Sequence, residues 1–249
     1  MISPKDKLLE DFQKYWRVES IYKPILPCLK SLRGFSFCYE ETFPDPKDYK
    51  EMQKHLIPIG VMPLFEQGFD PRVIEVPDFA KRMSTYFVPE GHRFATFTIR
   101  ATHYQNARNS DIKVFEDCAR YLITRGVVPI LIFDSDPSTD IEVAIDPSLW
   151  LVCDAARYNL LVRLGLYSRA VTNISTGGGP AHCLWYSELP FISTLVPDLS
   201  VNVTDPAWFP RFHGIPYGSQ YPWFSRSQRF IFGPESSDLI ISEMAKQGI

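Results

Sequence analysis

The residues most suited to binding chemistry form the stretch STGGGPAH at positions 175–182. Three consecutive glycines leave the backbone bare, which lets a ligand approach main-chain N–H groups closely, at a cost in chain entropy. A glycine-rich turn between a strand and a helix also presents the positive end of the helix dipole, and both features favour phosphate. We therefore predict that this stretch binds an anion, with a plain tight connection as the alternative.

A second polar stretch, TIRATHYQNARNS at positions 98–110, supplies the cations that such a site needs. Arg100 and Arg108 can bind a diphosphate and Asn109 can orient it, although an arginine at a strand end also forms structural ion pairs. Asn109 or Ser110 can equally cap the helix that follows. Because ligands of parallel sheets bind outside the carboxyl ends of the strands, we expect the two stretches to meet at one edge.

The elements that must position these stretches alternate between apolar strands and amphipathic helices. Residues 93–101 and 127–134 have the pattern of buried strands, and residues 111–126 between them have helical spacing that ends at Gly126. Further strands are expected at 147–153, 170–175 and 190–196, and helices at 154–170 and 179–189. This alternation predicts an α/β fold with a Rossmann-like, doubly wound parallel sheet, whose strands are covered on both faces.

The N-terminal part of the chain differs, because prolines recur throughout it. Each proline removes a backbone donor and fixes φ, which interrupts helices and central strands. Short elements are expected there: helices at 6–16, 45–56 and 77–88 and a strand at 35–40. We therefore divide the chain into a reduced N-terminal region, residues 1–91, and a Rossmann-like domain, residues 92–249.

Composition narrows the class of protein. The 249 residues carry a net charge of −3 without a basic run, which argues against nucleic acid as a partner. Five cysteines without a C-x-x-C pair favour buried thiols in a reducing compartment over disulfides or zinc, so we expect a cytoplasmic protein. No apolar run approaches the ~20 residues that span a bilayer, and peripheral membrane association stays open.

Three segments resemble the donor-binding domain of heptosyltransferase-like GT-B glycosyltransferases. Residues 154–197 are similar to a family segment of the general form adlvIgnDSGPmHlAaalgkPvvalfgp. Here residues 179–182 (GPAH) fall on its G-P-x-H, and Pro190 falls on the proline before its next strand. Residues 93–134 look like the first β-α-β unit of that domain, and residues 227–248 resemble its closing segment. The resemblance covers the Rossmann-like domain, and fucosyltransferase-like enzymes, with an arginine after their first donor-domain strand, are a second comparison.

The resemblance implies a glycosyltransferase that moves a sugar from a nucleotide-activated donor to a glycan or polysaccharide acceptor, as in polysaccharide biosynthesis. The nucleotide-sugar is then a co-substrate, and the resemblance implies neither a cofactor nor a metal. Cations and helix-end amides would stabilise the charge that grows on the leaving diphosphate. The residues assigned to donor binding are Arg100, Arg108, Asn109, Asp134, Thr176, Gly177, Gly178, Gly179 and His182.

The general base is left open by the sequence. It has to lie within hydrogen-bond reach of the acceptor hydroxyl whose proton it takes, and no position is preferred. The candidates are His103, Glu40 and Glu66, followed by Glu41 and His55. Asp134 opens the run DSDPSTD, which is more typical of a solvated turn than of a metal site.

Two departures from the family favour other functions. The family's acidic residue before S-G-P is Gly177 here, so a role carried by that carboxylate does not transfer. A proline-rich region replaces the N-terminal domain that carries the acceptor site. Both departures favour a non-catalytic nucleotide-sugar-binding protein, and a nucleotide-sugar hydrolase or epimerase is a further alternative, because its chemistry needs no acceptor domain.

An aromatic segment lies at 205–230 in the C-terminal part of the chain. Aromatic rings can stack on sugars, but a loop that packs over the domain is the favoured interpretation. His213 and Gln228 are expected to line the binding cleft from this side.

Overall fold

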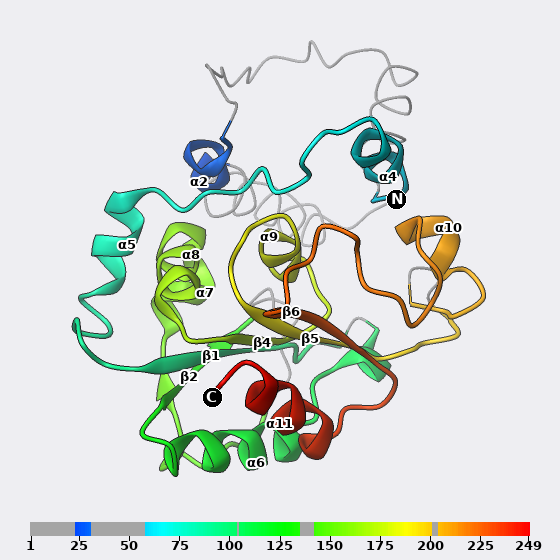
Figure 1. Ribbon diagram of the computed structural model, residues 1–249. Helices are drawn as coiled ribbons and strands as arrows, with labels where there is room; N and C mark the ends of the chain where they lie inside the picture. The colour runs from blue at the N-terminus through cyan, green and yellow to red at the C-terminus, as the bar shows by residue number, and fades with distance from the viewer. Residues whose placement is uncertain (1–22, 31–57, 104, 135–141, 201–203) are drawn as a thin grey trace, which may run out of the picture.

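A six-stranded parallel β-sheet forms the centre of the protein (Figure 1). The structure is a computed structural model, and it describes residues 23–30, 58–103, 105–134, 142–200 and 204–249. The strands are β1 (Phe94–Ile99), β2 (Val128–Phe133), β3 (Leu151–Val152), β4 (Asn173–Thr176), β5 (Phe191–Leu195) and β6 (Gln228–Phe232). Their order is β3-β2-β1-β4-β5-β6, and every neighbouring pair is parallel. The strand order therefore reverses between β1 and β4, which is the place where ligands of such sheets bind.

Helices cover both faces of the sheet (Figure 1). One face carries α6 (Ile112–Ile123) and α11 (Ser237–Lys246), and the other carries α5 (Asp78–Ser84), α7 (Asp154–Tyr158), α8 (Leu160–Arg169) and α9 (Ala181–Trp185). Shorter elements are α2 (Lys23–Ile25), η2 (Leu26–Cys28), α4 (Pro58–Glu66), η3 (Asn106–Arg108) and α10 (Phe209–His213). Each face has its own buried apolar core, one including Leu164 and Phe191 and the other Phe97 and Phe115. The Rossmann-like α/β fold predicted from the sequence is confirmed.

The central strand β4 is polar in sequence and yet fully buried. The side-chain amide of Asn173 donates to the carbonyls of Tyr167 (3.0 Å) and Pro190 (2.9 Å). Its oxygen accepts from the Thr96 hydroxyl at 2.6 Å. A buried polar group without a partner costs about 1–3 kcal/mol, so these bonds are what makes a polar strand compatible with the middle of the sheet.

The alternation of strands and helices follows the prediction, but two helices are shorter than expected. The helix expected at 77–88 ends at Ser84, and the helix expected at 179–189 ends at Trp185. After α9 the hydroxyl of Ser187 donates to the Leu184 carbonyl at 2.9 Å. A serine hydroxyl that donates to a helix carbonyl in this way competes with the backbone amide that would donate to the same carbonyl if the helix continued.

The N-cap of α6 was predicted one or two positions too early. Asp111, and not Asn109 or Ser110, is the N-cap. Its Oδ1 accepts from the amides of Lys113 (3.0 Å) and Val114 (3.5 Å). Asn109, Ser110 and Asp111 are all polar and each could cap the helix. The side chains of Asn109 and Ser110 are hydrogen-bonded to Thr102 and Arg100 instead, which leaves Asp111 as the cap.

The region before β1 packs tightly on the sheet layer. The Cβ of an alanine at position 165 in α8 would lie 2.1 Å from the carbonyl oxygen of Ala80 in α5, so only glycine permits this approach. α4 contains Pro63 in its interior, so the prolines of this region do not exclude a helix there. The elements expected at 6–16, 35–40 and 45–56 lie outside the described residues.

Buried thiols are found as the cysteine spacing predicted. Cys28, Cys118, Cys153 and Cys183 are free and buried, whereas Cys38 lies outside the described residues. None of the described helices combines the length and the apolar character that a bilayer crossing requires.

The aromatic segment before β6 packs over the sheet, as expected. Tyr221 and Trp223 stack with their ring centroids 4.3 Å apart. His213 is buried, with Nδ1 3.1 Å from the Tyr221 hydroxyl, and the Gln228 amide donates to carbonyls that follow α9. The expectation that His213 and Gln228 line a ligand cleft was therefore wrong, because both belong to the interior.

Candidate functional site

The two polar stretches meet at the carboxyl edge of the sheet. We call residues 100–111 the β1 loop and residues 177–180 the glycine turn. Nη2 of Arg108 donates to the Gly177 carbonyl at 2.9 Å, although the two residues are 69 positions apart. Nη1 of Arg108 donates to Oε1 of Gln105 at 2.7 Å, and Gln105 has a left-handed φ of 52° that side chains rarely adopt. A cation thus holds the β1 loop against the glycine turn.

The three glycines of the turn have different surroundings. A Cβ at Gly177 would lie 2.6 Å from Cδ2 of Leu195, and a Cβ at Gly178 would lie 2.8 Å from Oδ2 of Asp134. At Gly179 nothing lies within 4 Å, and the residue is exposed. At the first two positions a side chain would meet neighbouring atoms, so close packing favours glycine there. The third glycine is exposed to solvent.

The backbone amides of the turn are also used differently. The Gly177 amide donates to the Thr194 carbonyl of β5 at 2.8 Å. Within the described part of the chain, the amides of Gly178 and Gly179 make no hydrogen bond. These two amides are the donors that remain for an anion at this edge.

His182 lies in the first turn of helix α9 and contacts the glycine turn. Its Nδ1 lies 3.0 Å from the Gly178 carbonyl oxygen and 3.2 Å from that of Gly179. Carbonyl oxygens only accept, so Nδ1 carries the proton and Nε2 keeps its lone pair. The ring packs on Trp185 at 4.1 Å, and burial lowers the pKa of His182, which keeps it neutral at pH 7. His182 thus fixes two carbonyls of the turn.

Asp134 lies beneath the turn in a buried ion pair. Nη1 of Arg163 donates to its Oδ1 at 3.0 Å, and the two side chains are 3% and 10% exposed. The same guanidinium donates to the carbonyls of Phe133 (3.0 Å) and Ala156 (2.8 Å). Burial raises the pKa of Asp134, and the nearby Arg163 opposes that rise. Asp134 is therefore held by α8 while its other oxygen lies against Gly178.

Glu235 is the site residue that the sequence analysis missed. Its Oε1 accepts from the hydroxyls of Thr176 (2.7 Å) and Thr194 (2.5 Å), and its Oε2 accepts from the Asp111 amide (2.6 Å). Burial raises the pKa of Glu235, and these three hydrogen bonds oppose the rise. The available signal was its place in the loop that follows β6, three residues beyond Phe232, because the carboxyl ends of all parallel strands meet at one edge.

The remaining donor-binding candidates shape the β1 loop. The Arg100 amide donates to Oγ of Ser110 at 2.8 Å. Asn109 bonds twice to Thr102, accepting its amide at 3.1 Å and donating to its carbonyl at 2.9 Å. The Thr176 hydroxyl, besides its bond to Glu235, is hydrogen-bonded to Ser110. Arg100, Asn109 and Thr176 all lie at this edge; the hydrogen bonds given for Arg100 and Asn109 lie within the β1 loop, and those of Thr176 join separate loops.

The candidate bases are scattered. His103 is exposed in the β1 loop, and Glu66 is exposed at the end of α4. Glu40, Glu41 and His55 lie outside the described residues. The run at 134–140 is described only at Asp134, and no group of three or more metal-ligating side chains occurs among the residues that the structure describes.

The loop after β5 brings an anionic group toward Arg108. Hydrogen bonds from Ser200 hold the pKa of Asp198 below its usual range, and the charge of Arg108 adds to that effect.

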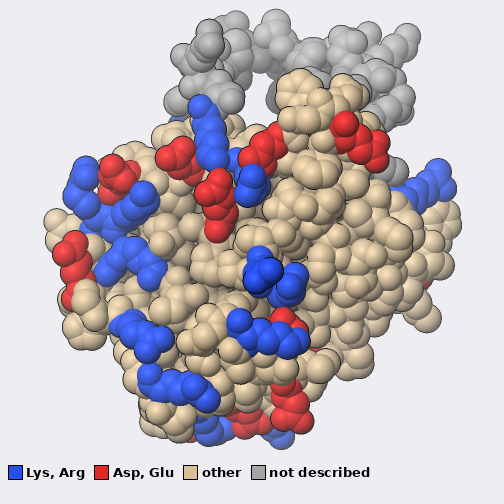
Figure 2. Space-filling view, in the orientation of Figure 1, with Lys and Arg blue, Asp and Glu red and all other residues tan. Residues whose placement is uncertain are grey.

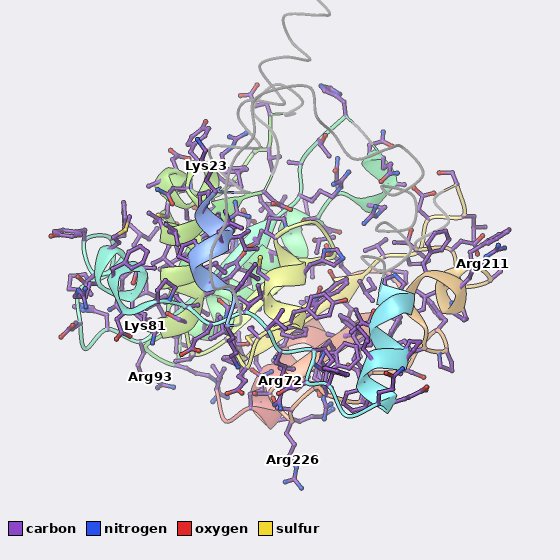
Figure 3. All side chains as sticks on the ribbon, turned by 90° about the horizontal axis from the view of Figure 1, so that it is seen from above. Lys23, Arg72, Lys81, Arg93, Arg211 and Arg226 are labelled. Atoms are coloured by element: carbon purple, nitrogen blue, oxygen red, sulfur yellow. The ribbon has the colours of Figure 1, made fainter. Side chains whose placement is uncertain are left out.

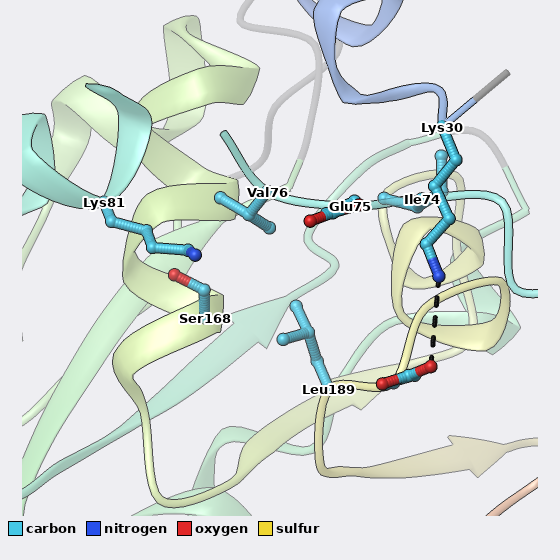
Figure 4. A pocket seen from close by; sticks show the side chains of 8 residues that line it. Lys30, Ile74, Glu75, Val76, Lys81, Ser168 and Leu189 are labelled. Atoms are coloured by element: carbon cyan, nitrogen blue, oxygen red, sulfur yellow. Dashed lines mark ion pairs between the residues drawn. The ribbon is translucent and has the colours of Figure 1, made fainter. Parts of the chain in front are cut away.

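The amino edge of the sheet has a different surface. Basic and acidic side chains are interspersed over the face that carries this edge (Figure 2), and Arg93 and Arg226 project from it (Figure 3). A hollow of about 310 Å³ opens there between Ser168 and Leu189 (Figure 4). Its wall includes an ion pair of 3.9 Å between Lys30 and Glu188, with Glu75 and Lys81 as further charged groups. Both signs of charge are present and exposed in this hollow.

Comparison with known proteins gives a fold likeness and nothing closer. No protein-family model and no curated protein matches the chain. Among solved structures, the ADP-heptose LPS heptosyltransferase II of E. coli is similar, with 12% identity and a TM-score of 0.50, over 70% of this chain and 52% of that one. The glycosyl transferase family 9 structure from Veillonella parvula DSM 2008 has 14% identity and a TM-score of 0.41, over 71% of this chain and 46% of that one.

The likeness to the heptosyltransferase, together with the parallel sheet covered on both faces, gives the class of fold. The heptosyltransferase match confirms the predicted likeness to that family at the level of the fold. At 12% identity it extends to the fold alone. The chain spans about half the length of both matched proteins.

Proposed function

We propose that the protein is a glycosyltransferase that binds a nucleotide-activated sugar at the carboxyl edge of its sheet and transfers the sugar to a glycan or polysaccharide acceptor. The observation that carries this proposal is the contact between Arg108 and Gly177, which joins a cation to a glycine turn at the switch point between β1 and β4. The fold shared with a heptosyltransferase supports it.

The chemistry follows from charge on the leaving group. When the glycosidic bond breaks, negative charge grows on the nucleoside diphosphate, and cations and fixed amides stabilise it. Arg108, with Arg100, supplies the positive charge, and the amides of Gly178 and Gly179 supply donors. Asn109 and His182 act by orienting the β1 loop and the turn. Asp134, which is buried in its ion pair with Arg163, supports the glycine turn from within the protein.

The base remains to be assigned by experiment. Of the candidates, His103 shares the β1 loop with Arg108, so it is the first to substitute. A base acts only within hydrogen-bond reach of the acceptor hydroxyl, and loss of turnover with retained nucleotide affinity is the expected signature.

Calorimetry with nucleoside diphosphates and their sugars tests the donor site. Arg108→Ala should weaken nucleotide binding about tenfold or more, because a charge-assisted hydrogen bond contributes roughly 1.5–3 kcal/mol. Arg82→Ala, which removes an exposed arginine of α5, is the matched control. Unchanged affinity in Arg108→Ala contradicts the proposal.

A second function is favoured by one observation. Gly177 stands where the heptosyltransferase-like family carries an acidic residue, and a Cβ at this position would require the Leu195 side chain to move. A nucleotide-sugar-binding protein without turnover needs no such group. Product analysis with and without an acceptor separates the two functions, and hydrolysis without an acceptor indicates a hydrolase.

A further inference from the structure

We propose that Glu235 is the positioning residue that sets the β1 loop against the glycine turn; its effect on ligand binding rests on the proposed function. The residue lies outside both stretches that the sequence singles out. It follows β6, the last strand at this edge of the sheet.

Three separate elements donate to this one carboxylate. Thr176 comes from the end of β4, Thr194 from β5 and the Asp111 amide from the start of α6. These donors are 59, 41 and 124 positions away in sequence. No other described carboxylate joins so many strands and loops at the carboxyl edge, and the carboxylate of Asp111 itself is turned into its own helix as the N-cap.

The hydrogen bonds run in one direction toward Glu235. Each hydroxyl has a single proton, so it can donate once. Thr176 donates to Glu235, and Ser110 accepts from the Arg100 amide, so the bond between the two hydroxyls must run from Ser110 to Thr176. The resulting chain passes from the Arg100 amide through Ser110 and Thr176 to the carboxylate.

The group that ends this chain of hydrogen bonds has to accept hydrogen bonds at both of its terminal atoms, as the two oxygens of Glu235 do. An ionised carboxylate accepts from all sides, whereas a glutamine presents an NH₂ group on one side. That group would either face the Asp111 amide, donor against donor, or force the chain of hydroxyls to reverse. The first outcome leaves the Asp111 amide without an acceptor, and the second makes Ser110 accept from both Thr176 and the Arg100 amide, so either one alters the bonds that join the loops.

The chain of hydrogen bonds matters because its two middle members, Ser110 and Thr176, lie close in sequence to Arg108 and to the glycine turn. Ser110 follows Arg108 by two residues, and Thr176 directly precedes Gly177, the residue whose carbonyl Arg108 holds. A shift between Ser110 and Thr176 therefore moves the cation away from the turn. Glu235 touches neither the cation nor the turn, so it acts through other residues.

Hydrogen exchange in the absence of nucleotide tests the positioning role. Glu235→Gln should raise amide exchange in residues 100–111 and 173–179 by about tenfold, with exchange in β2 unchanged. Asp238→Asn is the matched control, because it removes an exposed negative charge from the first turn of α11 and makes none of these bonds. Unchanged exchange in both segments overturns the proposal.

A second pair of variants separates positioning from general stability, and it decides the question if Glu235→Gln fails to fold. Thr194→Val removes a bond to Glu235 that lies outside the chain, whereas Ser110→Ala interrupts the chain itself. Ser110→Ala should raise β1-loop exchange and weaken nucleoside diphosphate binding about tenfold, and Thr194→Val should do neither to that extent. Equal effects of the two variants overturn the proposal.

The same experiments can contradict the proposed function without contradicting the positioning role of Glu235. If the unaltered protein binds no nucleotide while Glu235→Gln still raises exchange in the two segments, the glycosyltransferase proposal falls and the positioning role is supported.

Discussion

At the carboxyl edge of the sheet, hydrogen bonds between loops join residues far apart in sequence, whereas at the amino edge charged side chains form exposed ion pairs. Glu235 bonds to Asp111 across 124 positions, but Lys81 pairs with Asp78 in the same turn of α5. The bonds of Thr176 and Thr194 to Glu235 are partly buried, so water competes with them less, whereas exposed pairs such as Lys81 with Asp78 contribute little. The comparison indicates that the carboxyl edge has one fixed geometry and that the amino edge tolerates change.

The strongest test of this comparison is to remove one arginine from each edge. Arg163→Met leaves Asp134 buried without its partner and should cost about 3–5 kcal/mol of unfolding free energy. Arg72→Met breaks the exposed pair with Asp70 and should cost less than about 1 kcal/mol. Urea denaturation measures both values. Similar losses in the two variants would mean that the edges do not differ in the way described.

Within the carboxyl edge, two adjacent glycines give a finer test. Gly178→Ala brings a methyl group to 2.8 Å from the Asp134 carboxylate, which Arg163 holds in place, so we expect a loss of about 1–3 kcal/mol. Gly179→Ala meets nothing within 4 Å and should stay within about 0.5 kcal/mol of the parent. Thermal or urea unfolding checks the difference, and a larger loss at Gly179 would contradict it.

The smallest expected effect is a pH dependence from His182. Burial lowers the pKa of His182 below its usual 6.5, so the unfolded chain binds a proton more readily than the folded one. The contribution of a neutral His182 is therefore present above pH 6.5 and is lost as the pH falls, by at most about 1.4 kcal/mol per pH unit.

His182→Gln should remove this slope from the unfolding free energy measured below pH 6.5. The same substitution at the exposed His92 of the amino edge is the control. A slope that persists in His182→Gln assigns the pH dependence to another group.

Much of the fold follows from local sequence pattern. The apolar runs of β1 and β2 and the amphipathic pattern of α6 between them can be recognised from the sequence of each segment alone. The meeting of Arg108 with Gly177 also follows from topology, since loops at the carboxyl ends of parallel strands share an edge.

The errors arise where distant residues decide the outcome. Asn109 and Ser110 look like helix caps until Thr102 and Arg100 are seen to use them. Glu235 looks like an ordinary loop carboxylate, because its three donors come from elements that precede it by 41 positions or more. Local spacing contains no record of such contacts.

Gly165 constrains how this protein can change during evolution. The backbone of α5 fills the space that any side chain at position 165 would need. A descendant that replaces Gly165 must also displace α5 from α8. The two helices are therefore expected to diverge as a pair, and their joint inheritance would mark distant relatives that pairwise identity no longer reveals.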